Sequence, residues 1–162
     1  MADTRVQHQV ENWVRGHLNE VLAESFSLRS VALMSGGQFE FDLVNADGSL
    51  VGCISTSGLK TSGGKRGAGK IHKIFADMFF LSLAVGATRH MLVFTEETMY
   101  DAIKRQQRDG RVPSTFELRH VELPEDLHEQ LVDARRRASK EVSKTTAVEE
   151  LPDDVLLPGS KS

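Results

Sequence analysis

The chain has 162 residues, of which 40% are hydrophobic and 27% are charged, and its formal net charge at pH 7 is −3. This composition suits one compact domain with a hydrophobic core and excludes collagen-like and low-complexity chains. No apolar run reaches the roughly 18 residues of a membrane span, and the polar N-terminus is unlike a secretory signal. The single cysteine, Cys53, excludes an internal disulfide and a multi-cysteine metal site. We therefore expect a cytoplasmic protein without a membrane partner, in which Cys53 serves packing.

The first part of the chain predicts a helix followed by three strands. Apolar residues recur at helical spacing between residues 4 and 24, which indicates an amphipathic helix. Three short strand-like runs follow, separated by a Gly-Gly turn and by a turn that contains Asp-Gly, so we expect antiparallel pairing. The three predicted strands cover residues 26–34, 39–44 and 50–57.

The second part alternates helices and strands. An apolar helix follows the loop 58–69, and a short, almost continuously apolar strand follows that helix. The order α-β-β-β-α-β-α-β-α predicts an α/β (α+β) fold with a mixed central sheet flanked by helices. We expect a single domain over residues 1–143 and an acidic, flexible tail over residues 144–162. The elements predicted here are helix 71–85, strand 89–95, helix 96–108, strand 115–123 and helix 124–143.

The stretch SGGKRGAGKI, residues 62–71, resembles part of a phosphate-binding nucleotide loop. Gly64, Gly69 and Lys70 have the required spacing, but Ile71 stands where a hydroxyl group would bind Mg²⁺. We therefore expect no bound nucleotide. Two interpretations remain open: a solvated surface loop, or a cationic loop that contacts the phosphates of a nucleic acid, with DNA as the expected partner. The binding residues of the second interpretation are Lys60, Lys65, Arg66 and Lys70.

Two carboxylates in the strand FEFDLV form a candidate cation site. Strand alternation directs Glu40 and Asp42 to one face, about 6 to 7 Å apart. The same alternation directs Phe39, Phe41 and Leu43 to the opposite face. Two close carboxylates bind hard cations such as Mg²⁺, and a bound divalent cation activates water and neutralises phosphodiester charge. The alternative is a solvated strand face without a ligand.

The segment FEFDLV, the polar turn NADGS and the strand LVGCIS, in this order of elements, resemble the restriction-endonuclease-like, PD-(D/E)XK, nuclease superfamily over about residues 4–123. The resemblance implies that family's fold and a metal-dependent endonuclease activity. In the family, an Asp on the second strand and an acid-x-Lys on the third bind metal and position water, and an acid on the first helix often assists. Asp42 matches the first of these and Glu11 matches the assisting acid. Cys53 and Ser55 occupy the positions of the third-strand acid and lysine.

The resemblance then requires other residues to complete the site. Glu40 would supply the second metal-binding carboxylate, and Lys70, Lys73 or Lys60 would supply the missing ammonium group. The alternative for Lys73 is an i, i+4 pair with Asp77 on the helix surface. The alternative for the whole chain is a catalytically inactive relative that serves as a nucleic-acid-binding or protein-interaction module. A homodimer and a protein partner for the C-terminal tail are left open.

The remaining polar residues give weaker functional predictions. The six histidines show no spacing typical of metal ligands. A row of three arginines on the last predicted helix is expected to be a solvated face, with a second phosphate contact as the alternative. These residues are Arg135, Arg136 and Arg137.

Overall fold

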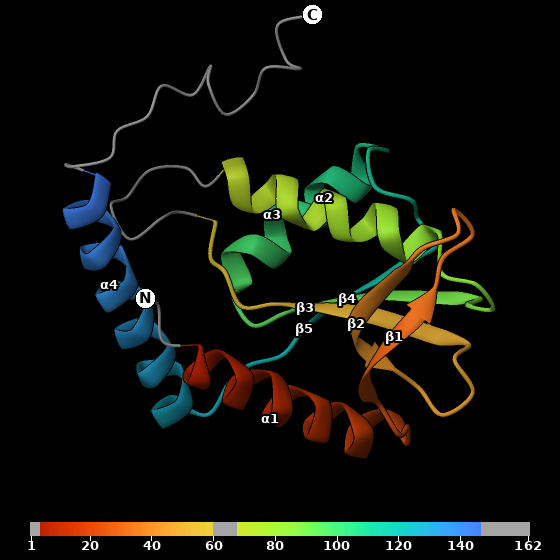
Figure 1. Ribbon diagram of the computed structural model, residues 1–162, viewed down its shortest axis with the longest axis horizontal. Helices are drawn as coiled ribbons and strands as arrows, with labels where there is room; N and C mark the ends of the chain where they lie inside the picture. The colour runs from red at the N-terminus through yellow and green to blue at the C-terminus, as the bar shows by residue number, and fades with distance from the viewer. Residues whose placement is uncertain (1–3, 60–67, 147–162) are drawn as a thin grey trace, which may run out of the picture.

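The computed structural model describes residues 4–59 and 68–146 (Figure 1). Within these residues the order of helices and strands is the one predicted from the sequence. Lys60, Lys65, Arg66 and residues 147–162 of the predicted tail lie outside the described residues, whereas residues 144–146 belong to the last helix. None of the described helices is long and apolar enough to cross a membrane. The elements are α1 (Arg5–Leu22), β1 (Ser27–Ala32), β2 (Gln38–Val44), β3 (Leu50–Ser55), α2 (Ala68–Ser82), β4 (Arg89–Phe94), α3 (Glu97–Arg108), β5 (Phe116–His120) and α4 (Glu125–Thr146).

The described strands form one mixed sheet in the order β1-β2-β3-β4-β5. The two short connections make β1/β2 and β2/β3 antiparallel, whereas the helical crossovers make β3/β4 and β4/β5 parallel. Helix α1 covers one face of the sheet and helices α2 and α3 cover the other, while α4 stands at the end of the sheet near the start of α1 (Figure 1). The mixed sheet flanked by helices is thus confirmed.

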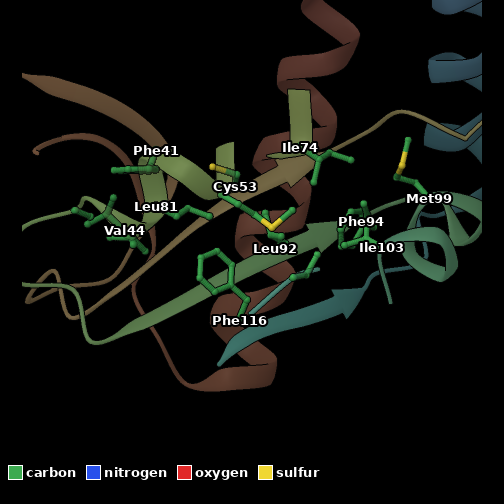
Figure 2. Close-up of a cluster of buried hydrophobic side chains, with 14 of the residues drawn as sticks. Phe41, Val44, Cys53, Ile74, Leu81, Leu92, Phe94, Met99, Ile103 and Phe116 are labelled. Atoms are coloured by element: carbon green, nitrogen blue, oxygen red, sulfur yellow. The ribbon is translucent and has the colours of Figure 1, made fainter. Parts of the chain in front are cut away.

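Hydrophobic side chains fill the space on both sides of the sheet. On the α1 side, Val10, Val14 and Leu18 are fully buried in a cluster with residues of β2, β3 and β4. Figure 2 shows the cluster on the other side, to which Cys53 belongs, and this confirms the packing role expected for the cysteine. Gly52 lets β3 approach β4 closely, because a Cβ at this position would lie 2.8 Å from the carbonyl oxygen of Met91.

A β-bulge interrupts β2 at the position of the candidate site. Ser27 of β1 pairs with Val44, but Arg29 pairs with Phe41, so two residue steps on β1 oppose three on β2. Phe41 therefore packs in the cluster under α2, whereas Leu43 packs in the cluster under α1. The prediction that strict alternation places both on one face is wrong, because the extra residue of a bulge rotates the strand locally.

Candidate functional site

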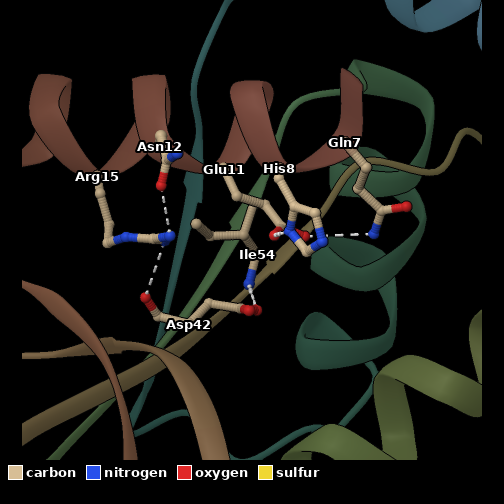
Figure 3. A network of polar contacts seen from close by, with 7 residues as sticks. All are labelled: Gln7, His8, Glu11, Asn12, Arg15, Asp42 and Ile54. Atoms are coloured by element: carbon tan, nitrogen blue, oxygen red, sulfur yellow. Dashed lines mark hydrogen bonds and ion pairs between the residues drawn. The ribbon is translucent and has the colours of Figure 1, made fainter. Parts of the chain in front are cut away.

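Asp42 lies where strands β2 and β3 stop pairing. The last backbone pair between these strands joins Leu43 to Gly52, although both strands continue beyond it. Beyond that pair, the side chain of Asp42 takes the place of a backbone partner. Its Oδ2 accepts a hydrogen bond of 2.8 Å from the backbone N–H of Ile54 (Figure 3). The carboxylate is thereby held between the two strands, where groups from both helical layers can act on it.

The acidity of Asp42 reflects this position. Its pKa is raised from 3.8 to about 6, chiefly because burial penalises the charged form, while the hydrogen bond from Ile54 opposes the rise. The negative charges of Glu11 and Asp77 raise the pKa further, and the ammonium of Lys73 lowers it. A poorly solvated carboxylate beside two further carboxylates is a group that a bound cation stabilises strongly.

Glu11 brings a second carboxylate to Asp42 from helix α1. It is buried, with 9% of its surface exposed. Gln7 donates a hydrogen bond of 3.2 Å from Nε2 to Oε2 of Glu11, and Nδ1 of His8 lies 3.5 Å from Oε1 (Figure 3). Both partners lie one helical turn before Glu11, so they orient its carboxylate. The structure places Glu11 beside Asp42, where the first-helix acid was expected.

Arg15 connects helix α1 to strand β2. Its Nη1 donates to the backbone carbonyl oxygen of Asp42 at 3.5 Å, and its Nη2 donates to Oδ1 of Asn12 at 3.0 Å (Figure 3). The helix that carries Glu11 is thus joined to the backbone of the residue that carries the central carboxylate. This contact helps to fix the position of one carboxylate relative to the other.

Asp77 brings a third carboxylate from helix α2, on the opposite face of the sheet. Nζ of Lys73 lies 3.6 Å from Oδ2 of Asp77, which confirms the predicted i, i+4 pair. The Lys73 side chain is 76% exposed and the Asp77 side chain only 17%. Burial raises the pKa of Asp77, and Lys73 lowers it. Sequence reasoning treated Asp77 only as a surface partner of Lys73, although an acid on a mostly apolar helix can indicate a functional group.

Glu40 is not part of this group. It is exposed on β2, opposite Ser30 of the edge strand β1. The described charges that shift the pKa of Asp42 belong to Glu11, Asp77 and Lys73, and not to Glu40. The structure therefore brings Asp42 together with acids from two helices, whereas the sequence suggested an acid from the same strand.

Lys70 also lies apart from Asp42. It belongs to the first turn of α2, and the charged groups that act on it are Arg135 and Glu96. Nη1 of Arg135 forms an ion pair of 2.8 Å with Oε1 of Glu96, and its side chain is only 29% exposed. The expectation of a solvated arginine face is therefore wrong for Arg135, because its guanidinium turns toward Glu96, directly before α3. Arg136 and Arg137 are exposed as expected.

The third strand offers no acid next to Asp42. Cys53 is buried, and burial, together with the negative charges of Asp77 and Asp42, raises the pKa of its thiol. The thiol therefore stays protonated at neutral pH and is a poor nucleophile and a poor metal ligand. The negative charges of Asp77 on α2 and Asp42 on β2 thus both act on the same thiol of β3.

Within residues 4–59 and 68–146, no three His, Cys, Asp or Glu side chains are close enough together to form a ready-made metal site. The comparisons with protein-family models, curated proteins and solved structures gave no match. The described residues form an α/β protein with a five-stranded mixed sheet, in which a largely buried aspartate of β2 is subject to the negative charges of Glu11 on α1 and Asp77 on α2.

Proposed function

We propose that this chain is a nuclease-like domain that engages nucleic acid and hydrolyses phosphodiester bonds with a divalent cation held at Asp42. The observation that carries the proposal is the position of Asp42 between the diverging strands β2 and β3, with Glu11 on one side and Asp77 on the other. Three carboxylates in a poorly solvated place repel one another unless a cation or protons neutralise them. Such an arrangement costs stability and is typical of functional sites.

The chemistry of Mg²⁺ fits this set of groups. Mg²⁺ is usually held by one or two carboxylates, several waters and the oxygens of a phosphate, and seldom by a cage made only of protein. Asp42 with either Glu11 or Asp77 would provide the carboxylates, and the substrate phosphate would complete the coordination. A cation bound there would supply an activated water and would neutralise charge on the phosphodiester. A site of this kind does not require three protein ligands that are already close together.

Among the described residues, Lys73 is the cation best placed to act beside the carboxylates. Its ammonium is paired with Asp77 and also acts on the pKa of Asp42. A positive charge there would hold a water near the carboxylates or stabilise negative charge on the phosphate. In the resemblance to the PD-(D/E)XK superfamily, Asp77 and Lys73 would replace the acid and the lysine that the third strand lacks. Glu40 and Lys70 remain ligand and catalytic predictions that rest on the sequence.

A second candidate function is a nucleic-acid-binding or protein-interaction module without catalysis. The specific observation in its favour is that Cys53 and Ser55 stand where the resemblance requires an acid and a lysine. A further observation is that Lys73 is mostly exposed, so it is held less firmly than a catalytic lysine needs to be. Both functions share the basic segment around Lys70 as the contact with phosphates.

The test is a cleavage assay on labelled single-stranded and duplex DNA and RNA with the full chain. We expect cleavage in Mg²⁺ or Mn²⁺ and none in EDTA. Cleavage that persists in EDTA would contradict the cation-dependent mechanism. Absence of cleavage on every substrate, together with retained nucleic-acid binding, would remove the enzyme and leave the binding module. Binding itself is measured at rising salt concentration, where phosphate contacts cause a steep loss of affinity.

A further inference from the structure

A small cavity of about 160 Å³ lies between the first turn of α1, the segment after β3, the first turn of α2 and the helix α4. It is smaller than the pockets of drug-sized ligands, which measure about 300–1,000 Å³. Its size therefore suits a single small group such as a tetrahedral anion. The polar residues that line it are Thr4, Gln7, Thr56, Ser57, Lys70 and Arg135.

Two cations, Lys70 and Arg135, line this cavity, and the carboxylate of Glu96 pairs with Arg135. Arg135 uses Nη1 for its ion pair with Glu96, whereas its Nη2 is buried and has no hydrogen-bond partner among the described residues. Burial lowers the pKa of Lys70, and the positive charge of Arg135 lowers it further. Within the described part of the chain, Nζ of Lys70 has no hydrogen-bond or ion-pair partner. A buried guanidinium nitrogen without an acceptor is costly, and an anion between the two cations would relieve both the missing bond and the repulsion.

The neutral groups around the cavity can also donate to an anion. Thr4, Thr56 and Ser57 carry hydroxyl groups that can turn toward an acceptor. Thr4 precedes α1 directly, and its side chain does not cap the helix, whose first turn contains no acidic residue. The N–H groups of that turn therefore add positive potential at this end of the cavity. The hydrogen-bond donors and the excess positive charge of the cavity are complementary to a negatively charged ligand that accepts hydrogen bonds.

Gln7 links the cavity to the candidate cation site. Its side chain lines the cavity and also donates a hydrogen bond of 3.2 Å to Glu11, which acts on Asp42. Thr56 and Ser57 follow Ile54, whose N–H holds Asp42, by two and three residues. The cavity is therefore next to the carboxylates and distinct from them.

From these observations we infer that the cavity is a phosphate subsite, which binds one phosphate group of the nucleic-acid substrate through Arg135 and Lys70. The inference rests on the proposed function for the identity of the substrate. The phosphate comes either from a strand end or from the backbone next to the bond that is cleaved. In either case it would fix the distance between the bound phosphate and Asp42 and so select the bond that is hydrolysed.

Phosphate binding without metal tests this inference separately from cleavage. We expect inorganic phosphate to raise the melting temperature of the full chain in EDTA. Asp42→Asn should show the same rise, and so should Arg136→Gln, which removes an exposed arginine next to Arg135 on the same helix. Lys70→Gln should bind phosphate about tenfold to a hundredfold more weakly, because a charge-assisted hydrogen bond is lost. Arg135→Gln should weaken phosphate binding to a similar extent. If Arg135→Gln unfolds because it loses the ion pair with Glu96, Lys70→Gln still tests the inference.

Oligonucleotides in EDTA then identify the source of the phosphate. Tighter binding of a 5′- or 3′-phosphorylated strand than of its unphosphorylated twin indicates a terminal phosphate. Equal binding of the 5′-phosphorylated, 3′-phosphorylated and unphosphorylated strands, with weaker binding of each by Lys70→Gln, indicates a backbone phosphate. The inference is overturned if phosphate fails to stabilise the parent chain, or if Lys70→Gln and Arg135→Gln bind phosphate as the parent does. Cleavage without phosphate binding would leave the proposed function standing, and phosphate binding without cleavage would leave the subsite standing.

Discussion

Asp42→Asn is expected to lower cation-dependent cleavage by about 100-fold or more, because it removes the central charge that would hold the cation and orient the reacting phosphate. The variant keeps an oxygen that can accept the hydrogen bond from Ile54, so the fold should survive. Circular dichroism should be unchanged, and cleavage rates at saturating Mg²⁺ give the size of the loss. Asp133→Asn, which neutralises a 65% exposed aspartate on α4, is the matched control.

Three further variants separate the arrangement seen in the structure from the one suggested by the sequence. Glu11→Gln and Asp77→Asn each remove a carboxylate that acts on Asp42. Glu40→Gln removes the exposed carboxylate on the same strand. We expect Glu11→Gln and Asp77→Asn to lower the rate of cation-dependent cleavage and Glu40→Gln to change it little. A loss with Glu40→Gln as large as with Asp42→Asn would show that Glu40 is the second ligand and that the proposed site is assembled differently.

The stability of the parent chain should fall as the pH rises through the range in which Asp42 loses its proton. Its pKa is about 6 in the folded chain against 3.8 for the ordinary group, so the folded state binds the proton more tightly. The stabilisation from that proton is complete below about pH 4, declines as the pH rises from about 4 to about 6, and is lost above about pH 6. The full effect is at most about 3 kcal/mol, since each pKa unit corresponds to about 1.4 kcal/mol.

Comparison with Asp42→Asn isolates this contribution from the other groups around it, which are Glu11, Asp77 and Lys73. Urea denaturation at pH 4 and at pH 7.5 gives the free energy of unfolding of both proteins. From pH 4 to pH 7.5, the free energy of unfolding of Asp42→Asn should rise relative to that of the parent by about 2 to 3 kcal/mol. A difference that stays constant with pH would show that Asp42 is not desolvated in the folded chain.

The fold could be predicted from local sequence patterns, whereas the candidate site could be predicted only in part. Helical and strand periodicity predicted the order of the elements, because each pattern depends on residues that are close in sequence. Asp42 was found from strand alternation, which paired it with Glu40, and from the resemblance of its strand to a known family. The bulge in β2 was not predicted, since it depends on the register with β1.

The partners of Asp42 were harder to predict because they come from different layers. Asp77 lies 35 positions further along the chain, and only the packing of α2 against the sheet lets its charge act on Asp42 and Cys53. Arg135 was taken for one of three similar surface arginines, and only the ion pair with Glu96 distinguishes it from its neighbours. Tertiary packing determines which distant side chains come together, and the local sequence around each residue contains no sign of that packing.

The most direct test of the claim that Asp42 centres a cation site is anomalous diffraction from a crystal of the full chain soaked in Mn²⁺ at pH 7.5. An ion about 2.0 to 2.3 Å from an oxygen of Asp42, with Glu11 or Asp77 as a second ligand, is the predicted result. An empty position at Asp42, under Mn²⁺ concentrations that saturate any cleavage, would contradict it.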